Sequence, residues 1–186
     1  MDAALKPARL SPSGYLGLVW GHYRKHWKAY TLPLAVLIVA QCFVRIDVNL
    51  TDSLPDRVFL TVKGAKSNIR RGDYIAFDYQ GTGPASPFPK GFHFVKIVGA
   101  VPGDVVTMDA HRGFYAGRPG DPSPRFLGLS KPVSKTGKPL DPGPTGTIPE
   151  GEYYVFAPHK DSLDSRYALT GWIHRSQIIG RARALF

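Results

Sequence analysis

A serine, a lysine and a compact polar segment are the residues of this chain whose types suit a joint chemical task. Ser53 lies in the stretch Asn49–Arg57, shortly after the one long apolar run. Lys96 stands among apolar residues, and residues 162–167 read Ser-Leu-Asp-Ser-Arg-Tyr. A serine hydroxyl becomes a nucleophile when a neighbouring base takes its proton, and a neutral lysine amine can be that base. The three stretches therefore indicate nucleophilic catalysis if the fold brings them together.

Lys96 has apolar neighbours on both sides in the sequence. Residues 92–101 predict a strand, in which Phe94, Lys96 and Val98 share one face. If that face is buried, desolvation lowers the pKa of the amine, and a neutral amine near pH 7 is a competent general base. Alternatively, Lys96 lies on a solvent-facing edge strand, where a charge discourages aggregation. The stretch alone leaves both interpretations open.

The polar segment at residues 159–167 also has two interpretations. It is too dense in aspartate and serine for a core helix. It could be an ordinary capped loop. Equally, Asp164 and Arg166 could form an ion pair that fixes the loop and holds Ser162 inward.

Composition indicates a mainly β protein. The 186 residues include 17 prolines and 20 glycines, which suit many short strands joined by turns and argue against a helical bundle. Residues from about 110 to 149 predict a loop-rich β insertion. The single cysteine excludes an intramolecular disulfide. Strands are expected at residues 57–62, 72–78, 92–101, 105–108, 151–157 and 171–182.

The apolar run Tyr30–Val44 carries no charge and is shorter than the roughly 20 residues that span a bilayer. Ile46, Val48 and a snorkelling Arg45 extend it, so a transmembrane helix is expected over residues 29–48. Basic residues precede the run, which predicts a cytoplasmic segment at residues 1–28. Residues 49–186 are then a periplasmic domain of a single-pass inner-membrane protein.

Two other interpretations of the run remain. It could be a cleaved signal peptide, although Gln41 stands where cleavage before Cys42 needs a small residue. It could also be a buried helix of a soluble domain. The net charge of +10 suits anionic lipid headgroups or nucleic acid. Without aromatic-basic interleaving or a helical basic stripe, membrane lipid is the expected partner and nucleic acid is not.

Together the stretches resemble the type I signal peptidases, which are serine–lysine membrane proteases. The resemblance covers residues 30–186 and depends on sequence boxes that occur in the family's order. They are Ser53-Leu54-Pro55, close to Ser-Met-x-Pro; Gly72-Asp73-Tyr74-Ile75-Ala76-Phe77; Lys96 to Val98 followed by Pro102-Gly103-Asp104; Ser162-Leu163-Asp164-Ser165-Arg166-Tyr167; and Gln177 to Ala182.

Some positions depart from the general secretion enzymes. Ile97 replaces the usual arginine, and Phe156-Ala157-Pro158 replaces Gly-Asp-Asn. The Ser-Leu-Pro form, the small size and Gly137-Lys138-Pro139-Leu140 look more like the TraF branch. Those enzymes process pilins in plasmid conjugation, and some of them release the pilin as a cyclic peptide.

The resemblance implies an antiparallel β-sheet or barrel around a buried lysine. It implies cleavage after small residues in an exported protein substrate, with Ser53 as nucleophile and Lys96 as general base. Ser162 then orients Lys96, while Asp164 and Arg166 fix its loop. The oxyanion hole uses the Ser53 backbone N–H and the Thr51 hydroxyl, donors worth about 10²–10³ in rate.

The histidines show no metal spacing, and the implied reaction needs neither metal nor organic cofactor. A second hypothesis is a membrane-tethered β-domain without chemistry, such as a scaffold of a pilus or secretion assembly. A third is nucleic-acid binding through the basic surface, which outward topology disfavours.

Overall fold

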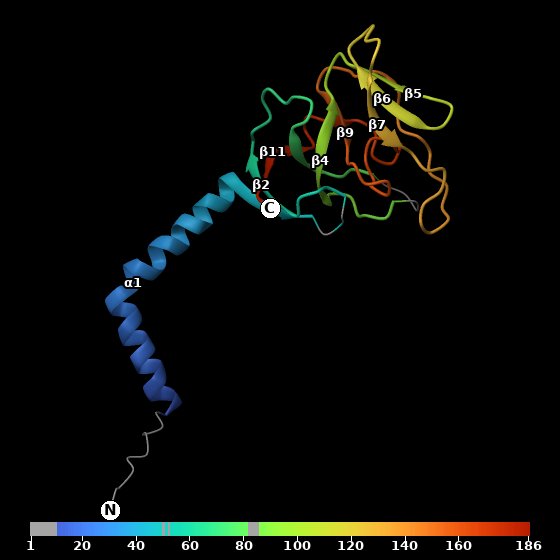
Figure 1. Ribbon diagram of the computed structural model, residues 1–186. Coiled ribbons are helices and arrows are strands. Elements are labelled where there is room, and N and C mark those ends of the chain that lie inside the picture. Colours follow the sequence, from blue (N-terminus) through green and yellow to red (C-terminus); the bar gives the residue numbers. More distant parts are fainter. Residues whose placement is uncertain (1–10, 50, 52, 82–85) are drawn as a thin grey trace, which may run out of the picture. The chain divides into compact units, whose positions relative to one another are not determined.

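The computed structural model describes residues 11–49, 51, 53–81 and 86–186. The chain divides into two units, Met1–Cys42 and Phe43–Phe186. The second unit is built from strands (Figure 1) and contains every candidate site residue. Residues 1–10 of the expected basic segment lie outside the described residues.

The first unit contains helix α1, Pro12–Phe43, in which no residue is buried. The transmembrane helix expected over residues 29–48 is not supported. Among the described residues, no helix combines the length and the apolar character needed to cross a membrane. The expected boundary is also wrong, because Val44–Val48 form strand β1 and pair with a neighbouring strand. Val44, Ile46 and Val48 are β-branched, and such side chains favour a strand once a partner is present.

The larger sheet has seven strands in the order β1-β2-β11-β3-β4-β9-β10. All its pairings are antiparallel, which confirms the mainly β, antiparallel fold class. The order is linear, so β1 and β10 are the edges of an open sheet. The remaining strands are β2 Val58–Lys63, β3 Tyr74–Asp78, β4 His93–Ala100, β9 Glu152–Phe156, β10 Ile173–His174 and β11 Ile178–Ala184.

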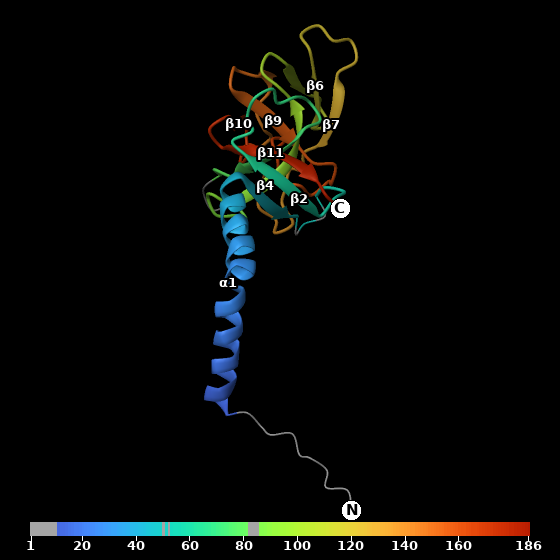
Figure 2. The same ribbon diagram turned by 90° about the vertical axis from the view of Figure 1, so that its left-hand side faces the viewer.

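The smaller sheet has four strands in the order β7-β6-β5-β8. The strands of this sheet are β5 Val105–Met108, β6 Gly113–Gly117, β7 Arg125–Leu129 and β8 Gly146–Thr147. The sheet therefore also includes β5, which precedes the insertion expected at residues 110–149. Figures 1 and 2 show it beside β4 and β9. One apolar cluster joins the two sheets, with Val106 and Phe114 on one side and Tyr154 and Phe156 on the other.

The closing strand expected at residues 171–182 is two strands, β10 and β11, separated by a turn. β11 pairs with both β2 and β3 and shifts register at Gly180. A Cβ at this position would lie 1.9 Å from the carbonyl oxygen of Val62. Only glycine permits so close an approach of the two backbones.

Strand β4 has apolar clusters on both faces. Val98 packs with Ile75 and Phe77 in one cluster. Ile97 points the other way and packs against the clusters of the opposite face. Because β4 is flanked by β3 and β9 and covered on both faces, a side chain near its middle is removed from water.

Candidate functional site

Lys96 occupies the buried middle of β4. Its side chain is 3% exposed, and its backbone pairs with Ile75 of β3. The amine lies 5.4 Å from the ring centroid of Phe94, and Nζ donates a hydrogen bond of 2.8 Å to Ser162 Oγ. Since β4 is a central strand, the edge-strand interpretation of Lys96 is wrong.

Burial lowers the pKa of Lys96 from its usual value of 10.5 to about 8. The Asp164 carboxylate acts in the opposite direction, and the Arg166 guanidinium lowers the pKa further. Because these two charges partly cancel, desolvation determines the direction. At pH 7 about a tenth of the molecules then carry the neutral amine that a general base requires.

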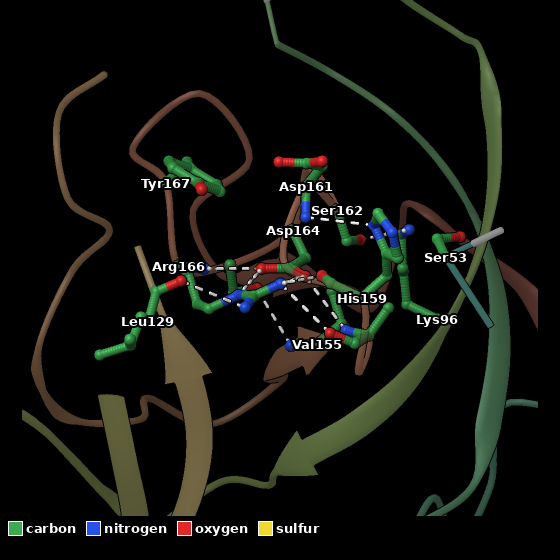
Figure 3. A network of polar contacts seen from close by, with 12 residues as sticks. Ser53, Lys96, Leu129, Val155, His159, Asp161, Ser162, Asp164, Arg166 and Tyr167 are labelled. Atoms are coloured by element: carbon green, nitrogen blue, oxygen red, sulfur yellow. Dashed lines mark hydrogen bonds and ion pairs between the residues drawn. The ribbon is translucent and has the colours of Figure 1, made fainter. Parts of the chain in front are cut away.

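Ser53 faces the same cavity as Lys96. Its side chain is 6% exposed, and it lies in the connection between β1 and β2. Ser53, Lys96 and Ser162 all line a cavity of about 720 Å³. In the view of Figure 3, the Lys96 amine lies between the hydroxyls of Ser162 and Ser53. The fold therefore brings together three residues that are far apart in the sequence.

The two residues expected in the oxyanion hole are adjacent to each other. The Thr51 hydroxyl lies 3.2 Å from Ser53 Oγ, and Thr51 also lines the cavity. The Ser53 backbone N–H, however, donates to the carbonyl oxygen of Thr51 at 2.6 Å. This contact has to open before that N–H can bind an oxyanion.

Asp164 and Arg166 form an ion pair that is almost completely buried, with side chains 0% and 2% exposed. Arg166 Nε donates to Asp164 Oδ1 at 2.8 Å, and Nη2 donates to Oδ2 at 2.7 Å. The guanidinium also donates to the carbonyl oxygens of Ala157, His159 and Leu129, all at 3.2 Å (Figure 3). The capped-loop interpretation is therefore replaced by the ion-pair interpretation.

The same loop is attached to β9 by its backbone. Ser165 N–H donates to the Val155 carbonyl at 3.0 Å, and Val155 N–H donates to Ser165 Oγ at 3.0 Å. Asp164 Oδ2 accepts from the Ala157 N–H at 3.0 Å. These bonds set the position of Ser162, whose own N–H donates to the His159 carbonyl at 3.1 Å.

A segment at residues 131–140 forms one wall of the cavity, a role that the sequence did not predict. Val133 and Pro139 pair as an isolated bridge, so the segment folds back on itself. Lys131 makes an ion pair with Asp161, and its N–H donates to the Tyr167 hydroxyl at 3.1 Å. The wall is thus attached to the loop that carries Ser162.

Asn49 is a second residue that sequence reasoning missed. Its side-chain oxygen accepts a hydrogen bond of 3.2 Å from Ser53 Oγ. The residue follows β1 directly, and its N–H donates to the Arg57 carbonyl at 2.7 Å. A single carboxamide upstream of a serine carries no spacing signal, so only the positions of the two side chains in the structure reveal this contact.

Comparison with known proteins identifies the family. Residues 25–186 match the family described as signal peptidase, peptidase S26. The chain belongs to this family. It is accordingly a serine endopeptidase of the signal peptidase I type, which acts on a protein substrate and removes signal peptides. The prediction of an enzyme is confirmed over the alternative of a scaffold without chemistry.

Among solved structures, the enzyme is similar to a signal peptidase I from Enterococcus faecalis V583. The sequences are 19% identical, the TM-score is 0.37, and the match covers 64% of this chain and 98% of that one. No curated protein sequence matches the chain.

The buried ion pair generates a prediction about stability. The substitution Arg166→Met leaves the Asp164 carboxylate buried without its partner, so the free energy of unfolding should fall by about 3–5 kcal/mol. Urea denaturation of the two proteins measures the difference. The control is Lys135→Met, which removes an ion pair to Asp161. The Lys135 side chain is 76% exposed, so this substitution should lower the free energy of unfolding by less than about 1 kcal/mol. Equal losses in the two variants would contradict the assignment of Arg166 as the residue that holds the loop.

Proposed function

We propose that Ser53 is the nucleophile and Lys96 the general base of this peptidase. The observation that carries the proposal is the state of Lys96, which is buried and has a pKa lowered by that burial to about 8. It lines one cavity together with Ser53. An ordinary surface lysine stays protonated at neutral pH and cannot accept a proton from a serine.

Ser162 supports this role by orienting the amine. A neutral amine has two hydrogens and one lone pair. Because one hydrogen is directed to Ser162 Oγ at 2.8 Å, rotation about the last side-chain bond is restricted. The lone pair can then be presented to Ser53 across the cavity, which is the arrangement that proton abstraction needs.

The reaction follows in two stages. Ser53 Oγ attacks the scissile carbonyl carbon while its proton passes to Lys96 Nζ, and the negative oxygen is stabilised by the Thr51 hydroxyl and the Ser53 N–H. The protonated amine then gives its proton to the leaving nitrogen, which leaves an acyl-enzyme. In the second stage a water molecule attacks the acyl carbon while one of its protons passes to the neutral Lys96 amine, and this proton then goes to Ser53 Oγ as the ester bond breaks.

We further propose that the substrate is a pilin precursor of a conjugation system. The support is the Ser53-Leu54-Pro55 sequence and the TraF-like residues 137–140, of which Lys138 and Leu140 line the cavity. If the amine of the pilin's own N-terminus enters in place of water, the product is a head-to-tail cyclic peptide. The incoming amine then gives a proton to Lys96, the ester bond to Ser53 breaks as the amide forms, and Ser53 Oγ takes that proton from Lys96.

Membrane attachment is the remaining part of the proposal. The second half of α1 exposes a series of apolar side chains, and the basic residues Arg24, Lys25 and Lys28 precede it. We propose that this apolar segment binds lipid and that residues 44–186 face the compartment to which the substrate is exported. The exposed side chains are Leu32, Leu34, Val36, Leu37, Ile38, Val39 and Phe43.

Co-expression with a candidate pilin precursor tests the reaction. The enzyme should yield a product of truncated mass by intact mass spectrometry, and Ser53→Ala and Lys96→Ala should each reduce its formation by roughly 10³-fold or more. Ser123→Ala and Lys66→Ala, which lie outside the cavity, are the controls. A product lighter than the linear form by one water molecule identifies cyclisation. Full processing by Ser53→Ala would falsify the proposed nucleophile.

The pKa of Lys96 predicts the pH dependence of kcat/KM. The base acts only when neutral, so the rate should rise with pH below the pKa and level off above about 8. At pH 6 it should be about 100-fold below the plateau. The substrate is a peptide without titratable groups near the scissile bond, so that ionisation of the substrate does not contribute to the pH profile. A flat profile between pH 6 and 9 would contradict Lys96 as the base.

Fractionation of cells tests the membrane proposal. The full chain should sediment with membranes and resist extraction at high salt. Replacement of both Leu34 and Leu37 by Asp should move it toward the soluble fraction, because neither side chain is buried and charged groups disfavour the lipid environment. Replacement of both His22 and His26 by Asn, also exposed, is the control. If the unsubstituted full chain is found in the soluble fraction, the proposal of membrane attachment is refuted.

A further inference from the structure

The carboxamide oxygen of Asn49 collects three donors from the segment that carries the nucleophile. Ser53 Oγ lies at 3.2 Å, the Thr51 hydroxyl at 3.1 Å and the Thr51 backbone N–H at 3.4 Å. The Thr51 hydroxyl also lies 3.2 Å from Ser53 Oγ. The Ser53 and Thr51 hydroxyls therefore both lie within hydrogen-bond distance of Asn49 Oδ1. This acceptor is separate from Lys96 and from the loop that carries Ser162.

The orientation of this carboxamide is determined by its neighbours. The Thr51 backbone N–H can only donate, so the atom that faces it has to be the oxygen of Asn49. The Asn49 Nδ2 atom is then buried, and it finds no hydrogen-bond partner within the part of the chain that the structure describes. An unsatisfied buried donor is unfavourable.

We propose that Asn49 is a positioning residue of the peptidase reaction, which holds the Ser53 and Thr51 hydroxyls at the cavity through its carboxamide oxygen. The inference rests on the proposed roles of Ser53 and Lys96. Asn49 itself does not touch the reacting atoms of the substrate.

The contacts also describe the resting state of the nucleophile. The Ser53 hydroxyl donates its hydrogen to Asn49, while the Lys96 amine donates to Ser162. On attack, the hydrogen has to turn from Asn49 Oδ1 to Lys96 Nζ, and the Ser53 oxygen forms the bond to carbon. The Thr51 hydroxyl also has a single hydrogen, so this hydrogen has to turn from Asn49 Oδ1 to the developing oxyanion, while the Thr51 backbone N–H keeps its bond to Asn49. Asn49 therefore restrains the Ser53 side chain in the resting state, and attack begins with the rotation of its hydroxyl hydrogen.

Two substitutions of Asn49 distinguish a role in positioning the hydroxyls from a role in the stability of the fold. One removes the hydrogen-bond acceptor and the other keeps it. In Asn49→Ala both hydroxyls lose their acceptor, so kcat should fall by about 10–100-fold with little change in KM. In Asn49→Asp the acceptor remains, and no buried N–H is left unpaired. Its negative charge also favours the protonated form of Lys96, so the midpoint of the pH profile should move to higher pH.

The pH comparison depends on the charges near Lys96. Asp164 and Arg166 act on the amine directly. The other charged or titratable groups that line the cavity beside Lys96 include His159, Asp161, Lys131, Lys135 and Lys138. All of these groups are present in every variant, so a difference in midpoint reports the change at position 49. Gln80→Glu adds the same charge at an exposed position outside the cavity and should leave the midpoint in place.

The assay uses a peptide with Ala at the first and third positions before the scissile bond, and measures kcat and KM from pH 6 to 10. We expect Asn49→Ala to be impaired at every pH with an unchanged midpoint, and Asn49→Asp to approach the wild-type kcat on its alkaline plateau. Wild-type kcat in Asn49→Ala, or equal impairment of the Ala and Asp variants at every pH, would overturn the inference.

Two further measurements separate this inference from the proposed dyad. Loss of cleavage in Ser53→Ala, with normal kcat in Asn49→Ala, leaves the dyad intact and refutes the role of Asn49. A crystal structure of Asn49→Ala gives a test that does not need a substrate. The Ser53 side chain should occupy more than one rotamer, and a single unchanged Oγ position would refute the inference even if the peptide is not cleaved.

Discussion

The ion pair between Asp164 and Arg166 is the contact on which the arrangement of the site depends. A charge removed from water is costly unless it is paired and its remaining hydrogen-bonding groups are satisfied. Here the guanidinium satisfies the carboxylate and also binds the carbonyls of Ala157, His159 and Leu129. Those carbonyls belong to the loop itself and to β7, so the pair joins the two sheets at the point where Ser162 is held.

The environment of Lys96 has to meet two requirements at once. The amine has to be buried to lose its proton, but a buried amine also needs a hydrogen-bond partner. A central strand with covered faces provides the burial, and Ser162 provides the partner. The neighbouring ion pair adds charges of both signs, so it holds the loop without reversing the effect of burial on the pKa of Lys96.

The proposed nucleophile, Ser53, is held by a separate part of the fold. Ser53 follows the edge strand β1 and contacts Asn49 and Thr51, whereas Lys96 and Ser162 are 66 positions apart and meet across β4 and the loop after β9. The wall at residues 131–140 comes from yet another connection, next to the smaller sheet. The wall, Ser53 and the Lys96–Ser162 pair thus come from separate connections of the same sheet scaffold.

The amino-acid sequence by itself determined the fold class, the approximate positions of most strands and the three stretches that meet at the candidate site. These properties depend on side-chain alternation and on turn residues that are close together in the chain. Gly72–Asp78, for example, could be assigned as turn and strand from its own residues, and β3 forms within it at Tyr74–Asp78.

Only the tertiary structure decided properties that depend on a distant partner. Val44–Val48 are as compatible with the end of an apolar helix as with a strand, and pairing with β2 makes them β1. Lys96 is buried because its strand is central in the sheet and because segments far away in the sequence, including the loop with Ser162, cover its side chain. The contact of Asn49 with Ser53 depends on where the fold places the two side chains. Segments far away in the sequence bury these side chains and provide their hydrogen-bond partners, so a local pattern of residues cannot predict either property.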